Sequence, residues 1–213
     1  MPEWLNGTVS KTVVGLALPW VRIPLSPLFF IKRKGMPMDI REIDQSWKGK
    51  SFLFRYKSNA HYQLSIKETD QEINFHLKRF PLPKEIEKSF ESSLFSDWLI
   101  NPKVYAAFEG EELLAFVEVS DEDWNNRLRI ANLWVAEGHR YQGIGKLLMA
   151  KVLELAKAGG KRAIVLETQS CNDPAIRVSR ACGFSLIGLD SIHYQNDDIQ
   201  RGEVRLEFGL KLA

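Results

Sequence analysis

The sequence predicts an α+β fold in which helices flank a mixed, mostly antiparallel sheet. Residues 51–80 alternate apolar and polar side chains over several short segments, as half-buried strands do. Residues 104–120 contain two more such segments joined by the tight Gly110-Glu111 pair, which is typical of a hairpin. Over residues 144–156, apolar side chains recur at helical spacing instead. Strands and helices in this mixed order indicate a sheet with helices packed on it.

The first half of the chain is predicted to contain strands and one helix. Three strands separated by short turns are expected, at 51–57, 61–67 and 72–80, with the turns at 58–59 and 69–70. Pro81 and Pro83 are expected to end the third strand, because proline cannot donate a ladder hydrogen bond. Apolar residues then recur at roughly helical intervals, which predicts an amphipathic helix over residues 85–99.

The second half is predicted to alternate strands and helices. The expected strands are 104–109, 112–120, 127–135, 162–168, one from Leu186 and one over 204–212, with a loop at 121–126. One helix is expected to begin at Ile144 and to end at Gly159-Gly160, since glycine terminates helices readily. A shorter helix is expected from Asn172 to Cys182, because asparagine caps helix N-termini and the nearby proline suits a first turn.

The composition gives the chain little net charge. Lysine and arginine number 29 and aspartate and glutamate 27, which leaves +2. So close a balance gives no reason to expect a nucleic acid or an anionic membrane as a partner. Cys171 and Cys182 have neither the spacing of a metal site nor that of a disulfide framework. We therefore expect no bound metal and a reducing, cytoplasmic location.

Residues 1–37 differ from the rest of the chain. Pro19, Pro24 and Pro27 interrupt the apolar runs, and no run reaches the ~18 uncharged apolar residues of a membrane-spanning helix. The order of basic, apolar and small residues that marks a secretory signal is also missing. We expect an ill-ordered leader, or upstream translation, at 1–37 and one globular domain at 38–213.

The stretch from Leu133 to Lys146 is expected to join a strand to a helix through a glycine loop. Gly143 and Gly145 allow a ligand to approach the backbone, since no Cβ stands in the way. The following helix directs unpaired N–H groups and the positive end of its dipole into the loop, which favours phosphate. The spacing Arg140-x-x-Gly143-x-Gly145 matches neither the P-loop nor the dinucleotide-binding pattern. We infer a pyrophosphate loop of another kind.

Several motifs resemble the GNAT superfamily of acyl-CoA-dependent N-acetyltransferases. They are Arg140-Tyr-Gln-Gly-Ile-Gly145, Leu166-Glu-Thr-Gln-Ser-Cys-Asn172, Ala175-Ile-Arg177 and Cys182-Gly-Phe184. Within the superfamily, Leu166–Gln169 together with Asn172, Ala175 and Gly188–Asp190 look like streptothricin acetyltransferases and their relatives. The resemblance is strongest over residues 104–188. It implies a GNAT-like fold with a splayed central strand pair, in an N-acetyltransferase domain over residues 38–213.

The resemblance implies acetyl-CoA as the co-substrate. The pantetheine arm of acetyl-CoA would pair with the strand before the loop as one more strand, since a splayed pair leaves unpaired backbone groups. Its pyrophosphate would bind the amides of the glycine loop. The cofactor-binding residues that follow are Leu133, Trp134, Val135, Arg140, Tyr141, Gln142, Gly143, Ile144, Gly145, Lys146 and Asn172. Asn172 fits an N-cap equally well.

The resemblance implies only one catalytic residue, in contrast to the many cofactor-binding residues. Glu167 matches the glutamate that some family members use as general base, and the alternative is a structural glutamate. Where the family usually places the tyrosine that protonates the coenzyme A thiolate, this chain has Ser179, which is a poor acid. Water or Tyr194 then supplies the proton, or turnover is slow or lost. The other position that the family uses for a base holds Arg129.

These residues predict an acetyl-CoA-dependent N-acetyltransferase that acetylates a primary amine by direct transfer. Acidic segments would draw a cationic acceptor, such as a streptothricin-type antibiotic, to a cleft lined by aromatic side chains. The candidate acceptor-site residues are Asp121, Glu122, Asp123, Trp124, Asp190, His193, Tyr194, Asp197 and Asp198. Two alternatives stay open: an acyl-CoA-binding or sensing module with weak or lost transfer, and a protein or peptide N-acetyltransferase. The partner is thus a small-molecule or peptide amine, and a homodimer is left open.

Overall fold

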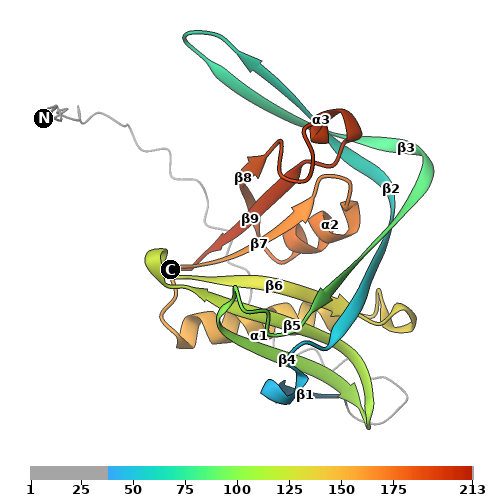
Figure 1. Ribbon diagram of the computed structural model, residues 1–213, viewed down its shortest axis with the longest axis vertical. Helices are drawn as coiled ribbons and strands as arrows, with labels where there is room; N and C mark the ends of the chain where they lie inside the picture. Colours follow the sequence, from blue (N-terminus) through green and yellow to red (C-terminus); the bar gives the residue numbers. More distant parts are fainter. Residues whose placement is uncertain (1–37, 213) are drawn as a thin grey trace, which may run out of the picture. The chain divides into compact units, whose positions relative to one another are not determined.

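The computed structural model describes residues 38–212 (Figure 1). In chain order its strands and helices are β1 (Met38–Ile43), β2 (Ser51–Glu68), β3 (Ile73–Ser93), β4 (Ile100–Glu109), β5 (Glu112–Glu122), β6 (Arg127–Val135), α1 (Ile144–Ala158), β7 (Ala163–Gln169), α2 (Asp173–Ala181), β8 (Ser185–Asp190), α3 (Asp198–Arg201) and β9 (Arg205–Lys211). The leader expected at 1–37 lies outside the described residues. No helix within 38–212 is long and apolar enough to cross a membrane.

The strands form two sheets. The larger has seven strands in the order β1-β4-β5-β6-β7-β9-β8, and β2 and β3 form a separate two-stranded sheet. Every neighbouring pair is antiparallel except β6 and β7, which are parallel. The predicted mixed, mostly antiparallel sheet flanked by helices is therefore confirmed. The elements predicted from residue 104 onward are present within a few residues of their expected ends, and among the described strands and α-helices of this part only the four-residue helix α3 was not expected.

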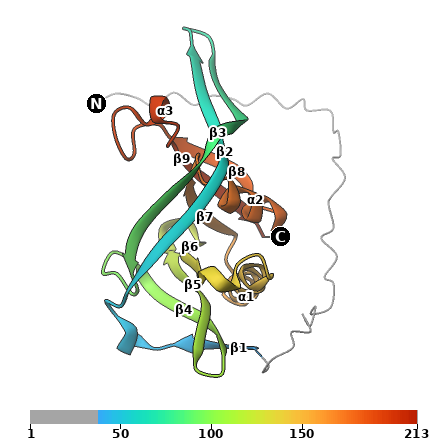
Figure 2. The same cartoon turned by 90° about the vertical axis from the view of Figure 1, so that its right-hand side faces the viewer.

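Helix α1 packs on one face of the large sheet, against β5 and β6 (Figure 2). Its buried residues include Ile144, Leu148, Val152 and Ala156, which recur every fourth residue and so share one face of the helix. They belong to the same apolar cluster as residues of β5, β6 and β7. Gly159 ends the helix by donating its N–H to the Leu155 carbonyl at 2.9 Å, as predicted from the paired glycines.

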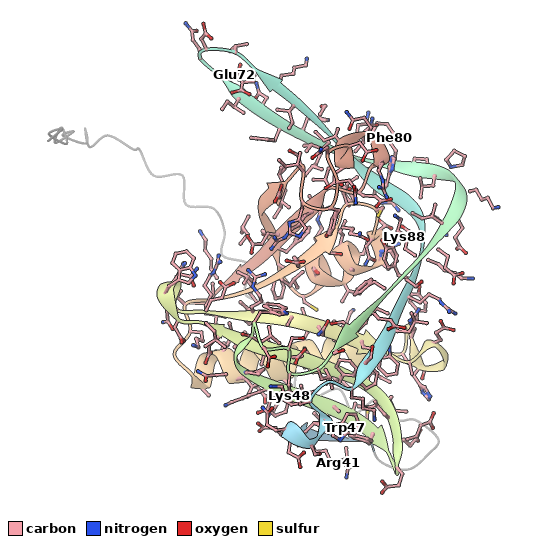
Figure 3. All side chains as sticks on the ribbon, in the orientation of Figure 1. Arg41, Trp47, Lys48, Glu72, Phe80 and Lys88 are labelled. Carbon is pink, nitrogen blue, oxygen red and sulfur yellow. The ribbon has the colours of Figure 1, made fainter. Side chains whose placement is uncertain are left out.

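Residues 51–93 form one long hairpin, which differs from the prediction. β2 is a continuous strand with an irregularity at 58–60, where two strands and a turn were expected. β3 continues to Ser93, where an amphipathic helix over residues 85–99 was expected. The turn expected near 69–70 is present and joins the two strands. Figure 3 shows Glu72 at this end of the hairpin.

The helix prediction is wrong because the spacing behind it is ambiguous. Residues four apart share a face in a helix and in a strand alike. Ile86 and Phe90 are such a pair, and they stand opposite Ser58 and Phe54 of β2. The rings of Phe54 and Phe90 stack with their centroids 5.0 Å apart. Contacts across the hairpin therefore decide the conformation, and the sequence of β3 alone does not contain them.

The two prolines expected to end β3 lie instead beside an irregular stretch of the hairpin. Ladder pairing resumes at Ala60 and Pro81 after a bulge that holds residues 82–85. Pro83 falls within this bulge, where no ladder hydrogen bond is required of it. Among the described strands β3 pairs with β2 alone, so Pro81 can also lack an N–H without breaking a second ladder.

An aromatic cluster attaches the hairpin to the face of the large sheet opposite α1. Between ring centroids, Phe52 of β2 lies 4.6 Å from Phe116 of β5 and 5.5 Å from Trp134 of β6. Phe116 is buried, while its neighbours Ala115 and Val117 belong to the apolar cluster that includes α1. Alternation of side chains along β5 thus builds a core on each face of the sheet.

Tyr56 of β2 joins the hairpin to β7. Its hydroxyl donates to Gln169 Oε1 at 2.5 Å and lies 3.2 Å from Cys171 Sγ, and its ring is buried. We expect Tyr56→Phe to lower the free energy of unfolding by about 1–2 kcal/mol, because the buried bond is lost. Urea unfolding measures the change. Tyr141→Phe, at an exposed ring, is the control and should shift it by less than about 0.5 kcal/mol. Equal losses in both variants would contradict this role for Tyr56.

Candidate active site

Strands β6 and β7 separate halfway along their length. They pair in parallel only where Arg127–Ile130 faces Ala163–Leu166. Beyond that point β6 continues to Val135 beside β5, and β7 continues to Gln169 beside β9. The splayed central strand pair is therefore confirmed. One edge of β6 after Ile130 has no partner among the described strands.

Leu133 and Val135 present their backbone groups to this open edge. Ala136 donates its N–H to the Leu114 carbonyl of β5 at 2.9 Å. Because backbone groups alternate in direction along a strand, Trp134 also faces β5, and Leu133 and Val135 face away from it. An extended ligand with its own amides can pair with these two residues as an added strand.

The side chains of Trp134 and Arg140, two predicted cofactor residues of the strand and loop, form hydrogen bonds inside the protein. Trp134 Nε1 donates to the Leu53 carbonyl at 3.0 Å, and its ring stacks on Phe116 with centroids 5.5 Å apart. Arg140 Nε donates to the Val135 carbonyl at 3.1 Å, which fixes the glycine loop to the end of β6. Trp134 therefore belongs to the core under the hairpin, whereas Arg140 lies at the open edge.

The glycine loop presents a run of amides that make no hydrogen bond within residues 38–212. These N–H groups belong to Tyr141, Gln142, Gly143, Ile144, Gly145 and Lys146. Tyr141, at φ 60°, and Gly143, at φ 85°, adopt the left-handed conformation, and such turns gather successive N–H groups into an anion-binding concavity. Gln142 Nε2 closes the loop by donating to the Gly138 carbonyl at 2.9 Å. Unpaired amides at the start of a long helix favour phosphate.

The loop lies directly beside the open edge of β6. A Cβ added at Gly145 would stand 3.8 Å from Val135 Cγ2 and would meet nothing closer. The two features predicted to hold a cofactor, the unpaired strand edge and the unpaired amides, are therefore adjacent. A molecule with an amide-bearing arm and a diphosphate can contact both at once.

Asn172 and Ser179 are both committed to helix α2. Asn172 Oδ1 accepts the N–H of Ala175 at 3.2 Å, so its side chain forms the N-cap. Ser179 is buried, and its hydroxyl donates to the Ala175 carbonyl at 2.8 Å. The serine that replaces the family's tyrosine thus places its only hydroxyl proton in a hydrogen bond within the helix.

Glu167 lies at the cavity that opens where β6 and β7 separate. The cavity measures about 420 Å³ and is lined by Phe90, Glu91, Ser92, Trp98, Arg129, Ile130, Ala131, Asn132, Glu167 and Arg205. Glu167 Oε2 lies 2.5 Å from Arg205 Nη2 and 3.8 Å from Arg129 Nη1. Two guanidinium groups therefore orient the carboxylate that was predicted as general base. A larger hollow of about 630 Å³ lies along one turn at the hairpin tip, residues 68–73, and contains none of the predicted site residues.

The acidic residues predicted to attract the acceptor do not gather at this cavity. Asp121 pairs with Lys161 Nζ at 2.7 Å, and the buried Asp198 accepts the N–H of Tyr194 at 2.8 Å. Besides residues of β6, β7 and β9, the lining comes from β3 and from the turn after it, which reach the site because β3 is a strand. Among the predicted acceptor-site residues, Tyr194 is close enough to Glu167 for the carboxylate charge to affect the pKa of the tyrosine. Burial raises the pKa of Tyr194, and the negative charge of Glu167 raises it further.

Sequence reasoning missed Glu118 and Asn132. Glu118 of β5 is fully buried and accepts two hydrogen bonds at 2.6 Å, from the Phe95 N–H and from Asn132 Nδ2. Burial raises the pKa of Glu118, although both hydrogen bonds oppose that shift. A single carboxylate inside the apolar run 113–119 was the available signal, since a buried charge is costly and often functional.

Comparison with known proteins identifies the family. A model of the acetyltransferase (GNAT) family matches residues 70–184. The chain belongs to this family.

Two streptothricin acetyltransferases are similar to part of the chain. It is 43% identical over 84 residues to a streptothricin acetyltransferase of Streptomyces lavendulae, and that match covers 39% of this chain and 44% of the relative. It is 33% identical over 91 residues to a streptothricin acetyltransferase of Escherichia coli, across 43% of this chain and 52% of the relative. The chain thus matches about half the length of each.

Two solved acetyltransferase structures resemble the chain over a larger share. A nourseothricin acetyltransferase has a TM-score of 0.62 and 26% identity, and the alignment covers 83% of this chain and 99% of that one. A putative streptothricin acetyltransferase from Bacillus anthracis, in complex with acetyl coenzyme A, has a TM-score of 0.58 and 26% identity. That alignment covers 83% of this chain and 100% of the other. The GNAT-like fold expected from the motifs is therefore confirmed.

Proposed function

We propose that this GNAT protein is an acetyl-CoA-dependent N-acetyltransferase. Its acceptor would be a primary amine on a cationic small molecule of the streptothricin type. The observation that carries the proposal is the place of the cavity. It opens where β6 and β7 separate, next to the unpaired edge of β6 and to the loop with unpaired amides. Cofactor and acceptor can therefore meet at one point of the sheet, and the named activities of the similar proteins support this reading.

The cofactor contacts follow from the unpaired backbone groups. The backbone groups of Leu133 and the N–H of Val135, whose carbonyl already accepts from Arg140 Nε, would pair with the amides of the pantetheine arm, and the amides of residues 141–146 would hold the diphosphate. Lys146 adds positive charge at the start of α1, close to those amides. Acetyl-CoA supplies an activated acyl group as a thioester. The acetyl-CoA in the similar Bacillus anthracis structure supports this choice of co-substrate.

The reaction needs a neutral amine and a protonated leaving thiolate. Glu167 would accept the proton of the ammonium group, directly or through water, and the neutral nitrogen would then attack the thioester carbonyl. Arg205 and Arg129 would keep the carboxylate oriented at the cavity. We favour direct transfer over a cysteine relay, because burial raises the pKa of both Cys171 and Cys182 and so disfavours their thiolates. Both cysteines are free, which supports the proposed cytoplasmic location.

The source of the proton for the coenzyme A thiolate can be tested with two hydroxyl deletions. Ser179→Ala should change kcat by no more than about twofold, because that hydroxyl already donates within α2. Tyr194→Phe should lower kcat at least about tenfold, since Tyr194 is the remaining hydroxyl that we propose as donor; its raised pKa keeps it protonated but also makes it a weaker acid. Thiol release measures both. The reverse order of effects would make Ser179 the donor and would contradict the assignment to Tyr194.

The proposed activity is tested by thiol release from acetyl-CoA in the presence of different amines. We expect streptothricin to accelerate release far above the rate with acetyl-CoA alone, and polyamines and peptides to do so less. Release with peptides but not with streptothricin would favour a peptide N-acetyltransferase. Calorimetric binding of acetyl-CoA without release on any amine would favour a binding or sensing module and would overturn the proposed transfer.

A further inference from the structure

A buried carboxylate stands behind the acceptor cavity without a cation to balance it. Glu118 is 0% exposed, and no lysine, arginine or histidine within residues 38–212 forms an ion pair with it. Both of its hydrogen bonds come from neutral donors, the Phe95 N–H and Asn132 Nδ2. Burying an ionised carboxylate without a charged partner costs free energy, so its presence calls for a reason beyond stability.

The register between β5 and β6 places Asn132 between Glu118 and the cavity. The two residues are direct partners in the ladder, next to a β-bulge in which Ala131 of β6 is the extra residue. Asn132 lines the cavity from β6, beside Ala131 and Arg129. Its Nδ2 donates to Glu118, while its Oδ1 makes no hydrogen bond within residues 38–212 and is not closed off from solvent. One side of the carboxamide is thus held inside the protein and the other side is available to a ligand.

Glu118 determines which atom of Asn132 is available. An ionised carboxylate only accepts hydrogen bonds, so the carboxamide must turn its NH₂ group toward Glu118. The carboxamide oxygen is then left for the cavity. A carboxylate is also the side chain of this length that can accept from Phe95 and Asn132 at the same time. Phe95 lies in the turn after β3, which also brings Trp98 to the same cavity, so one buried group fixes two parts of the cavity wall.

We propose that Glu118 is a positioning residue, which holds Asn132 so that the carboxamide oxygen accepts an N–H of the amine acceptor. This inference rests on the proposed acetyltransferase function and adds a polar contact for its acceptor. The oxygen of Asn132 is a suitable group for that contact, because an ammonium nitrogen offers only N–H donors, and the neutral amine that it becomes still offers N–H donors beside its lone pair. The negative charge of Glu118 strengthens the contact by polarising the carboxamide between them.

The first experiment inverts the carboxamide. In Glu118→Gln, the new Oε1 can still accept the Phe95 N–H, and the new NH₂ group must donate to Asn132 Oδ1. Asn132 then turns its own NH₂ group to the cavity. There it faces the N–H of the amine, and two donors cannot form a hydrogen bond with each other. We expect the KM for streptothricin to rise at least about tenfold, with the Kd for acetyl-CoA unchanged.

Thermal unfolding separates this role from a structural one. The raised pKa means that Glu118 holds its proton more tightly in the folded protein than in the unfolded chain. Its contribution to stability therefore falls as the pH rises from the pKa of an unfolded glutamate through the raised pKa of Glu118. Removing the charge should therefore leave the Tm at neutral pH equal or higher. A lower Tm in Glu118→Gln, with kcat and KM both impaired, would indicate that the residue only maintains the fold.

A second substitution should restore the contact. In Glu118→Gln/Asn132→Asp, the introduced glutamine donates to one oxygen of the introduced aspartate and the other oxygen faces the cavity. The KM for streptothricin should then return to within about threefold of the original. Asn132→Asp alone sets two carboxylates against each other and should be worse than the double variant. A double variant no better than Glu118→Gln would overturn the proposal.

Two controls distinguish a failure of the role proposed for Glu118 from a failure of the proposed acetyltransferase function. Asn132→Leu retains the size of the side chain without its oxygen and should raise the same KM, even if Glu118→Gln fails to fold. Calorimetric titration of streptothricin reports binding without turnover. Absence of thiol release by the unaltered protein would contradict the acetyltransferase activity, whereas normal release with an unchanged KM and Kd in Glu118→Gln and Asn132→Leu would contradict only the role of Glu118. Streptothricin that does not bind the unaltered protein would overturn both.

Discussion

Gly143→Val is expected to weaken acetyl-CoA binding at least about tenfold. Gly143 has φ 85°, a conformation that a β-branched residue adopts only with strain of about 1–3 kcal/mol. The valine would shift the loop out of this conformation and disperse the amides of residues 141–146. Isothermal titration calorimetry measures the loss, and circular dichroism shows whether the variant remains folded.

Gly138→Val is the matched control for the loop. Gly138 lies five positions earlier, its φ is not positive, and a Cβ added there meets nothing within 4 Å. The same side chain is therefore added near the loop without strain, and the Kd for acetyl-CoA should change by less than about twofold. Unchanged affinity in a folded Gly143→Val variant would contradict the role of this loop in binding the diphosphate.

Glu167→Gln is expected to lower kcat by about 10²–10⁴-fold, the usual contribution of a general base. The loss should be greatest at low pH, where the acceptor amine is almost wholly protonated and most needs a base. The glutamine keeps the size of the side chain, so the Kd for acetyl-CoA should not change. A pH profile of thiol release with streptothricin measures the effect, and full activity across the profile would exclude Glu167 as base.

Glu207→Gln provides a control for charge alone. Glu207 of β9 pairs directly with Glu167 in the sheet and binds the same Arg129, with 2.9 Å between Oε1 and Nη2, but it does not line the cavity. Its substitution removes one negative charge from the same ion-pair group. We expect kcat to fall by less than about threefold. An equal loss in both variants would assign the effect of Glu167 to the ion pairs and not to proton transfer.

The half of the fold that carries the motifs was predictable because its signals are local. Gly110-Glu111, Gly159-Gly160 and Asn172 each fix a turn, a helix end or a helix start through their own backbone or side chain. Residues 51–99 were not predictable in the same way. There a spacing of four fits two structures, and only pairing between β2 and β3 selects one of them.

The candidate site also has a part that was predictable from local sequence and a part that depends on strand pairing. The glycine loop was predicted from consecutive residues, and its amides are indeed unpaired within residues 38–212. Glu118 and Asn132 lie in different strands, and only the register of β5 against β6 brings them together. Ser179 shows a further limit, because its sequence position suggested contact with the cofactor while its hydroxyl bonds inside α2.

The central claim is that one site binds acetyl-CoA along β6 and passes the acetyl group to an amine in the cavity beside Glu167. Mass spectrometry of streptothricin after incubation with the protein and acetyl-CoA, with free thiol counted in the same samples, tests it most directly. The account predicts one acetylated amine for each thiol released, and loss of both in Glu167→Gln. Thiol released without acetylated streptothricin, or acetyl groups that stay on the protein, would contradict it.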